Sequence, residues 1–134
     1  RALEVGDTEG ITVLPGAAEL LADLRRGGVP TAIVTSCTTD LAAARMRATR
    51  LPSPEVVVTA SDVRRGKPWP DPWLEGAARL GVDPADCLVV EDSVAGLTAA
   101  RAAAVSAWSR AMVALVRVSA GGAMGMLGIA TLSV

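Results

Sequence analysis

The sequence contains no histidine, no phenylalanine and no tyrosine. Without histidine, the chain has no Ser-His-Asp triad, no Cys-His pair, no imidazole general base and no histidine ligand for zinc or haem. Cysteine is also scarce, since Cys37 and Cys87 are too few and too far apart for a disulfide framework or a thiolate metal site. We therefore expect a reduced, cytoplasmic protein whose chemistry depends on carboxylates and hydroxyls.

Lysine is rarer than cysteine, because Lys67 is the only lysine among 13 basic residues. A lysine ammonium is a compact point charge and an arginine guanidinium is a broad planar fork, so a site built for the first does not accept the second. Lys67 is therefore a candidate functional residue. The formal net charge of −1 shows no basic surface for nucleic acid, and we expect no nucleic-acid partner.

The length and composition indicate one globular domain. The chain has 134 residues, of which 51% are hydrophobic, and this is enough for a single packed core. Short apolar runs alternate with longer segments of helical periodicity, which is the pattern of a parallel sheet buried on both faces. The predicted strands are 31–35, 56–58 and 87–90; the predicted helices start after Gly16, at Thr38–Asp40, at Pro70–Pro72 and at Ser93. The fold class is therefore α/β.

Polar side chains follow each predicted strand. Ser36 and Cys37 come after the first strand, Lys67 lies in the segment after the second, and Glu91 and Asp92 end the third. Ligands of open α/β sheets gather at the carboxyl ends of the strands. A hydroxyl and an ammonium suit phosphate oxygens, and paired carboxylates suit a hard cation such as Mg²⁺. The pattern predicts phosphoryl-transfer chemistry.

The same segments resemble motifs of the haloacid dehalogenase superfamily. These are Ile33-Val34-Thr35-Ser36, then Arg65-Gly66-Lys67-Pro68 with Pro70, and then Val89-Val90-Glu91-Asp92-Ser93 with Gly96. The chain is similar to the branch of sugar phosphatases and β-phosphoglucomutase, from about Thr8 to Ala104. The resemblance implies a Rossmann-like parallel sheet with flanking helices.

The resemblance also implies roles for individual residues. Ser36 would donate to the substrate phosphate, with Cys37 beside it where the family usually has glycine. Lys67 would neutralise the phosphoryl group and the attacking carboxylate. Asp92 would ligate Mg²⁺. Glu91 would be either a second ligand of the ion or a residue that contacts the ligands without touching the ion.

The family's nucleophile and its acid/base partner are two aspartates on an earlier, central strand that we do not find. The nearest match is Asp7-Thr8-Glu9-Gly10-Ile11, which has glutamate in place of the second aspartate and follows a segment too poor in apolar residues for a buried strand. We expect residues 1–13 to be a remnant of the cap or linker. We expect 14–118 to be a partial core that lacks the nucleophile strand and the cap, and 119–134 to be a divergent apolar tail.

The C-terminal segment departs from the family pattern. We favour a strand over 112–118 followed by the tail, and a transmembrane helix over 112–134 is the alternative. Arg117 and a cluster of glycines weaken the membrane alternative. The two tryptophans that follow Lys67 in the sequence, Trp69 and Trp73, are interpreted as packing residues.

Three functions remain open. The first is a phosphatase that acts on a small phosphorylated sugar or similar metabolite through an aspartyl-phosphate, with this chain an incomplete and inactive form. The second is a mutase of the β-phosphoglucomutase type. The third is a degenerate α/β domain that binds magnesium or phosphate. Without a central strand, two inner strands would lack partners, and we expect self-association through exposed sheet edges.

Overall fold

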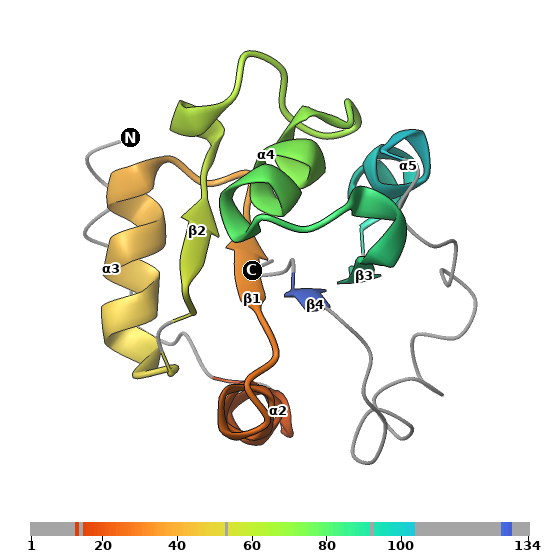
Figure 1. Ribbon diagram of the computed structural model, residues 1–134. Helices are drawn as coiled ribbons and strands as arrows, with labels where there is room; N and C mark the ends of the chain where they lie inside the picture. The colour runs from red at the N-terminus through yellow and green to blue at the C-terminus, as the bar shows by residue number, and fades with distance from the viewer. Residues whose placement is uncertain (1–12, 14, 53, 92, 104–126, 130–134) are drawn as a thin grey trace.

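The computed structural model describes residues 13, 15–52, 54–91 and 93–103, together with the backbone of 127–129. Helices and strands alternate along the chain, as Figure 1 shows. In chain order the elements are α2 (Ala17–Arg26), β1 (Thr31–Val34), α3 (Thr39–Thr49), β2 (Val56–Val58), η1 (Ala60–Asp62), α4 (Asp71–Leu80), η2 (Pro84–Asp86), β3 (Leu88–Val90), α5 (Val94–Ala102) and β4 (Leu127–Ile129).

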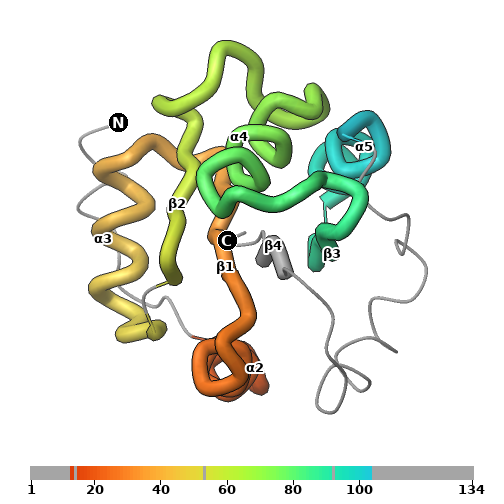
Figure 2. Tube along the Cα trace, viewed as in Figure 1, coloured from red at the N-terminus to blue at the C-terminus, as the bar shows by residue number. Residues whose placement is uncertain are grey.

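The described strands form one sheet in the order β2-β1-β4-β3, and each neighbouring pair is parallel. Figure 2 shows β2 and β1 side by side. Ile33 of β1 is in register with Val57 of β2 on one side and with Ile129 of β4 on the other. Ile129 is also in register with Val90 of β3. The predicted α/β class with a parallel sheet is confirmed.

Helices cover both faces of the sheet, which explains the unbroken apolar strands. Alternate residues of β3 point to opposite faces, since Val89 packs on one hydrophobic cluster while Leu88 and Val90 belong to another. The first cluster contains Trp73 of α4 and residues of α5; the second contains Leu24 of α2. All four residues of β1 are buried. The core therefore holds β1 in place and fixes where the chain leaves it.

The helix ends follow the local signals in the sequence. The hydroxyl of Ser93 accepts a hydrogen bond from the backbone N–H of Gly96 at 3.0 Å, and so caps α5 as predicted. Helix α4 ends at Gly81, which has a positive φ of 70° that glycine adopts without strain. The serine cap places the start of α5 directly after β3, at the carboxyl end of the sheet.

Strand β4 corrects one expectation about the sheet. It lies within 119–134, which we expected to be a tail, and it pairs with both β1 and β3. The expectation that two inner strands lack hydrogen-bond partners is therefore wrong. A three-residue Leu-Gly-Ile segment has no periodicity of its own, and its strand conformation comes from pairing on both sides. The strand predicted over 112–118 lies outside the described residues.

Within the part of the chain that the structure describes, no helix is both long and apolar enough to cross a membrane.

Candidate active site

Loops from three strands meet at the carboxyl edge of the sheet, at the top of Figure 1. The side chain of Lys67, from the loop between β2 and α4, donates a hydrogen bond to the carbonyl oxygen of Val34 at 3.1 Å. It also donates to Oε2 of Glu91, just after β3, at 2.7 Å. Residues separated by 33 and 24 positions in the chain are thus in direct contact. The parallel sheet produces this meeting point, because its strands all end on the same side.

The ion pair between Lys67 and Glu91 is buried. The side chain of Lys67 is 7% exposed and that of Glu91 is 1% exposed. A charge in the protein interior is costly unless it is paired and hydrogen-bonded. Glu91 meets this requirement with both oxygens, since Oε1 accepts the backbone N–H of Ser93 at 3.0 Å. The pair places one positive and one negative group at a fixed position at the end of the sheet.

Space for the Glu91 carboxylate depends on Gly96, in the first turn of α5. A Cβ atom at Gly96 would overlap the carboxylate, far inside van der Waals contact. Gly96 belongs to the third motif segment noted in the sequence, and the structure supplies a steric reason for a residue without a side chain at that position. Sequence spacing alone gave no sign of this contact.

A compact turn orders the loop that carries Lys67. The hydroxyl of Thr59 accepts the backbone N–H of Ser61, while the carboxylate of Asp62 accepts the backbone N–H of Thr59 at 2.7 Å. This backbone hydrogen bond is the main reason that the pKa of Asp62 lies below its usual value, and the Thr59 hydroxyl and Arg79 lower the pKa further. The carboxylate of Asp62 in turn contributes to a raised pKa of Arg79, whose first cause is the hydrogen bond to Glu75.

The two tryptophans that follow Lys67, Trp69 in the loop and Trp73 in α4, have different environments. Trp73 is 3% exposed and lies in the main core cluster, so its interpretation as a packing residue is confirmed. Trp69 is 51% exposed, and that interpretation is wrong for this residue. The centroid of its ring lies 4.4 Å from the guanidinium carbon of Arg65. The nitrogens of the same guanidinium donate two hydrogen bonds to the carboxylate of Asp71. The exposed Trp69 ring therefore stacks on an arginine rather than in the core.

Ser36 and Cys37 lie where the sequence places them, directly after β1. Ser36 is exposed and Cys37 is half-buried. The hydroxyl of the buried Thr35 accepts the backbone N–H of Cys37 at 3.2 Å and holds this turn in shape. Nη1 of Arg45 lies 3.0 Å from the sulfur of Cys37. Ser36 thus follows the strand whose last carbonyl oxygen receives Lys67.

The second cysteine, Cys87, is buried in the core just before β3. Cys87 is 2% exposed, and its thiol donates to the carbonyl oxygen of Asp83 at 3.2 Å. Burial is the main reason that the pKa of the Cys87 thiol rises to about 11. The group therefore stays neutral at physiological pH and acts as a small core residue.

The described residues do not by themselves form a metal site. No group of three or more potential ligands from histidine, cysteine, aspartate or glutamate gathers among the residues that the structure places. Glu91 is already bound to Lys67 and to the N–H of Ser93. Asp92 and the Asp7 segment lie outside the described residues.

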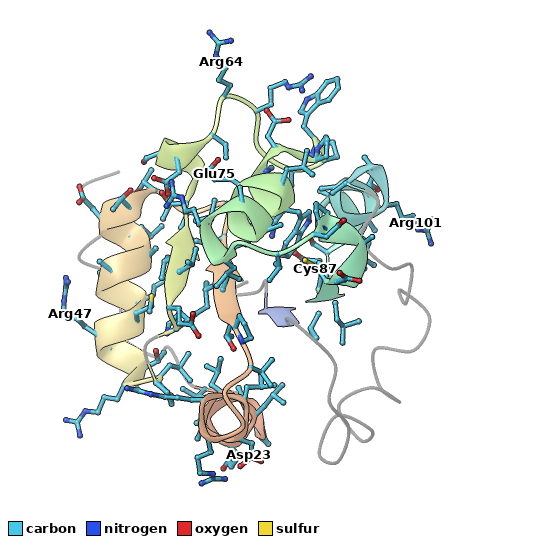
Figure 3. The ribbon with its side chains drawn as sticks, viewed as in Figure 1. Asp23, Arg47, Arg64, Glu75, Cys87 and Arg101 are labelled. Carbon is cyan, nitrogen blue, oxygen red and sulfur yellow. The ribbon has the colours of Figure 1, made fainter. Side chains whose placement is uncertain are left out.

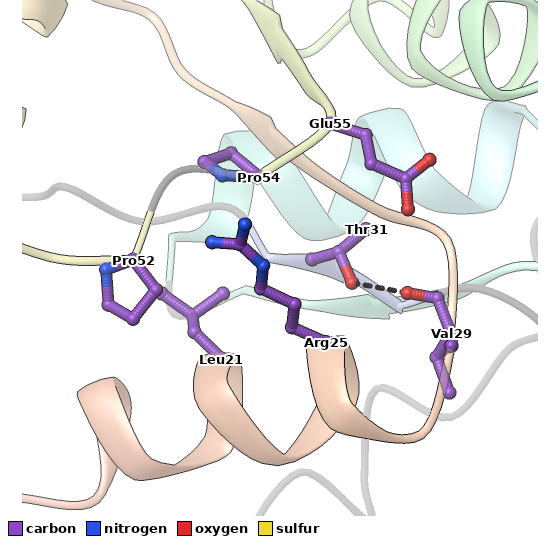
Figure 4. Close-up of a pocket in the computed structure, with 8 residues that line it drawn as sticks. Leu21, Arg25, Val29, Thr31, Pro52, Pro54 and Glu55 are labelled. Carbon is purple, nitrogen blue, oxygen red and sulfur yellow. Dashed lines mark hydrogen bonds between the residues drawn. The ribbon is translucent and has the colours of Figure 1, made fainter.

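A cavity of about 280 Å³ lies at the opposite end of the sheet, near the start of β1 (Figure 4). Arg25, Thr31, Pro52 and Glu55 are among its lining residues. Lys67 and Glu91 are not part of its lining. This cavity is therefore separate from the buried ion pair.

The sequence also matches a family model described as haloacid dehalogenase-like hydrolase, over residues 2–104. The chain belongs to the haloacid dehalogenase-like hydrolase family. The resemblance seen in the three motif segments is thereby confirmed, and these segments supply Lys67, Glu91 and Gly96 of the buried cluster.

Known members of this family provide the comparison. The chain is 52% identical over 101 residues to hexitol phosphatase A from Escherichia coli K12, a match that covers 75% of this chain and 47% of that protein. A crystal structure of CbbY from Rhodobacter sphaeroides with xylulose-1,5-bisphosphate is 32% identical, has a TM-score of 0.68, and is matched over 74% of this chain and 47% of that one. The chain thus spans about half the length of these relatives.

A haloacid dehalogenase family hydrolase from Deinococcus radiodurans, solved with bound phosphate and sodium, matches a larger part of the chain. The match covers 95% of this chain and 58% of that one, with 29% identity and a TM-score of 0.68.

Proposed function

We propose that the full-length protein is a phosphatase that hydrolyses a small phosphorylated sugar or a similar metabolite. The buried pair of Lys67, from the loop after β2, and Glu91, just after β3, meets the end of β1 at Val34, and this is the observation that carries the proposal. The names of the relatives support it, since hexitol phosphatase A is named as a phosphatase and CbbY was solved with a sugar bisphosphate. A mutase of the β-phosphoglucomutase type is not favoured by any described contact.

The proposed role of Lys67 is to neutralise the phosphoryl group. An ammonium has three N–H donors, and Val34 and Glu91 accept two of them. We assign the third donor to a phosphate oxygen, with the hydroxyl of Ser36 and the turn at Cys37 as its neighbours after β1. Charge-assisted hydrogen bonds of this kind are about twice as strong as neutral ones.

The nucleophile in this proposal is an aspartate that forms an aspartyl-phosphate, and the described residues do not contain it. Glu91 is the carboxylate in contact with Lys67, and its two oxygens are both engaged. Strand β4 contributes no carboxylate nucleophile, because residues 127–134 include neither aspartate nor glutamate. We therefore expect the 134 residues by themselves to show no turnover.

Magnesium is the proposed cofactor, and it would bring a positive charge next to the phosphate. The described residues do not fit a magnesium site on their own, since Glu91 is engaged with Lys67. The proposal therefore rests on Asp92, from its sequence position beside Glu91. A small phosphorylated metabolite is the proposed partner.

The test is a phosphatase assay of the full-length protein with sugar phosphates and magnesium, run beside the 134-residue chain. We expect Lys67→Arg to lower turnover of the full-length protein at least tenfold, which corresponds to about 1.4 kcal/mol in the barrier, because the guanidinium does not fit between Val34 and Glu91. Arg47→Lys is the matched control, because Arg47 extends into solvent from α3, far from the site (Figure 3).

Two results would contradict the proposal. The first is full turnover in Lys67→Arg, which removes Lys67 from the site. The second is steady turnover by the 134-residue chain that Asp7→Asn abolishes, since this would make the Asp7 segment the nucleophile loop.

A further inference from the structure

Trp73 contacts Lys67 of the buried ion pair and the backbone of Gly96, the residue that leaves room for Glu91. It sits in the first turn of α4 and is 3% exposed. One part of its side chain faces Lys67 and another part faces the first turn of α5, next to Glu91. Besides filling the core, Trp73 thus links Lys67 to the start of α5.

The ring of Trp73 lies against the lysine. Nζ of Lys67 is 4.8 Å from the centroid of the ring, within the distance at which a cation is attracted to an aromatic face. Tryptophan provides the strongest such face among the aromatic side chains, and the attraction increases where water is excluded. The ammonium is thus bounded by a carbonyl oxygen, a carboxylate and an aromatic ring.

The indole N–H of Trp73 binds the first turn of α5, beside Glu91. It donates a buried hydrogen bond of 3.1 Å to the carbonyl oxygen of Gly96. Gly96 is the residue whose missing side chain leaves room for the Glu91 carboxylate. The hydrogen bond therefore fixes the backbone against which Glu91 rests.

We propose that Trp73 is the positioning residue of the phosphate site: its ring locates the Lys67 ammonium and its N–H locates the α5 turn that supports Glu91. This inference rests on the proposed function, because it assigns to Lys67 the binding of phosphate. Phenylalanine at this position would keep a ring but lose the N–H, and leucine would lose both. The two substitutions therefore separate the two contacts.

The single lysine makes a direct test possible in the 134-residue chain. Selective ¹³C labelling of lysine produces one side-chain signal, which belongs to Lys67. We expect a ring-current displacement of the protons next to Nζ in the wild type, and a further change of this signal as inorganic phosphate is added. Trp73→Leu should lose the displacement and raise the phosphate dissociation constant at least fivefold. Trp73→Phe should keep the displacement and raise the constant at least twofold.

Trp69→Leu is the matched control. It removes the neighbouring tryptophan in the loop before α4, whose ring contacts Arg65. We expect it to leave both the displacement and the phosphate dissociation constant as in the wild type. Removal of the ring abolishes the ring-current displacement whatever the role of Trp73, so the displacement reports the ring contact and the phosphate dissociation constant of a folded variant tests the positioning role. Circular dichroism of each variant accompanies the titration.

The outcomes distinguish this inference from the proposed function. If phosphate does not change the Lys67 signal of the wild type, the phosphate site is wrong, and this inference is wrong with it. If phosphate binds the wild type and a folded Trp73→Leu equally well, only the inference is overturned. If Trp73→Leu does not fold, unchanged phosphate affinity in Trp73→Phe overturns it.

Discussion

Glu91 places a carboxylate in the interior, where an unpaired charge costs several kcal/mol. The ammonium of Lys67 and the backbone N–H of Ser93 compensate this cost. Removal of one partner from such a buried pair destabilises a protein by about 3–5 kcal/mol. The residues around Glu91 therefore affect both the stability of the fold and the geometry of the site.

We expect Gly96→Ala to destabilise the protein although it lies in a helix. Helix propensity alone favours alanine over glycine by about 1 kcal/mol. The new methyl group would overlap the Glu91 carboxylate, and overpacking of this kind costs about 1–3 kcal/mol, so the net change is a loss of up to about 2 kcal/mol. Urea unfolding measures it.

Gly66→Ala is the control for this substitution, because nothing lies within 4 Å of a Cβ atom at Gly66. Its stability should stay near that of the wild type. Equal or greater stability in Gly96→Ala would show that Glu91 does not occupy the space beside Gly96.

At the scale of elements, the loop between β2 and α4 determines where Lys67 lies. Its first part is the turn η1, closed by reciprocal hydrogen bonds between Thr59 and Asp62. Its last part leads into α4, where Trp73 meets Lys67. The loop is therefore anchored at both ends, and the lysine is presented from a defined backbone.

The charge of Asp62 should make this anchoring depend on pH. Its folded-state pKa lies below the ordinary value of 3.8, so its contribution to stability is present above that pH and is lost as the pH falls through the folded-state value. Asp62→Asn should therefore lower the free energy of unfolding at pH 7, by less than about 1 kcal/mol because the group is partly exposed. Urea unfolding of both proteins at pH 7 and pH 3 should show this difference shrinking in acid, and a constant difference would contradict the assignment.

At the scale of the whole molecule, the site exists because distant segments end at one edge of one sheet. Val34 ends β1, Lys67 lies in the loop that follows β2, and Glu91 follows β3. Strand β4, from the far end of the sequence, lies between β1 and β3 and joins the two halves of the sheet (Figure 1). The distance between the β1 edge and the β3 edge is thus controlled by a segment that carries none of the predicted site residues.

We expect Gly128→Pro to break this connection. Gly128 is in register with Ala32 of β1 and with Val89 of β3, and proline removes a ladder donor in the middle of the sheet. One lost hydrogen bond with its carbonyl left unpaired costs about 1–3 kcal/mol. Exposed edges of β1 and β3 should then lead to self-association, which sedimentation velocity detects.

Gly128→Ala is the comparison for the proline variant, because alanine keeps the N–H. It should lose less stability than Gly128→Pro. A proline variant that stays monomeric and as stable as the wild type would show that β4 does not hold the sheet together.

The amino-acid sequence by itself determined the α/β class, three of the four described strands and the starts of α4 and α5. These features depend on local patterns, namely apolar runs, prolines at the start of α4 and a serine cap at the start of α5. It also indicated Ser36, Cys37, Lys67, Glu91 and Asp92 as candidates, because each follows a strand. Their roles stay predictions, and Asp92 lies outside the described residues.

Only the tertiary structure decided which groups touch. The pairing of Lys67 with Glu91, the contacts of Trp73 with Lys67 and Gly96, and the need for glycine at position 96 join segments far apart in the chain. The placement of β4 is of the same kind, since Leu127–Ile129 is a strand because β1 and β3 pair with it. Local propensity acts over a few residues, whereas burial, ion pairing and strand pairing depend on neighbours that only the folded chain brings together.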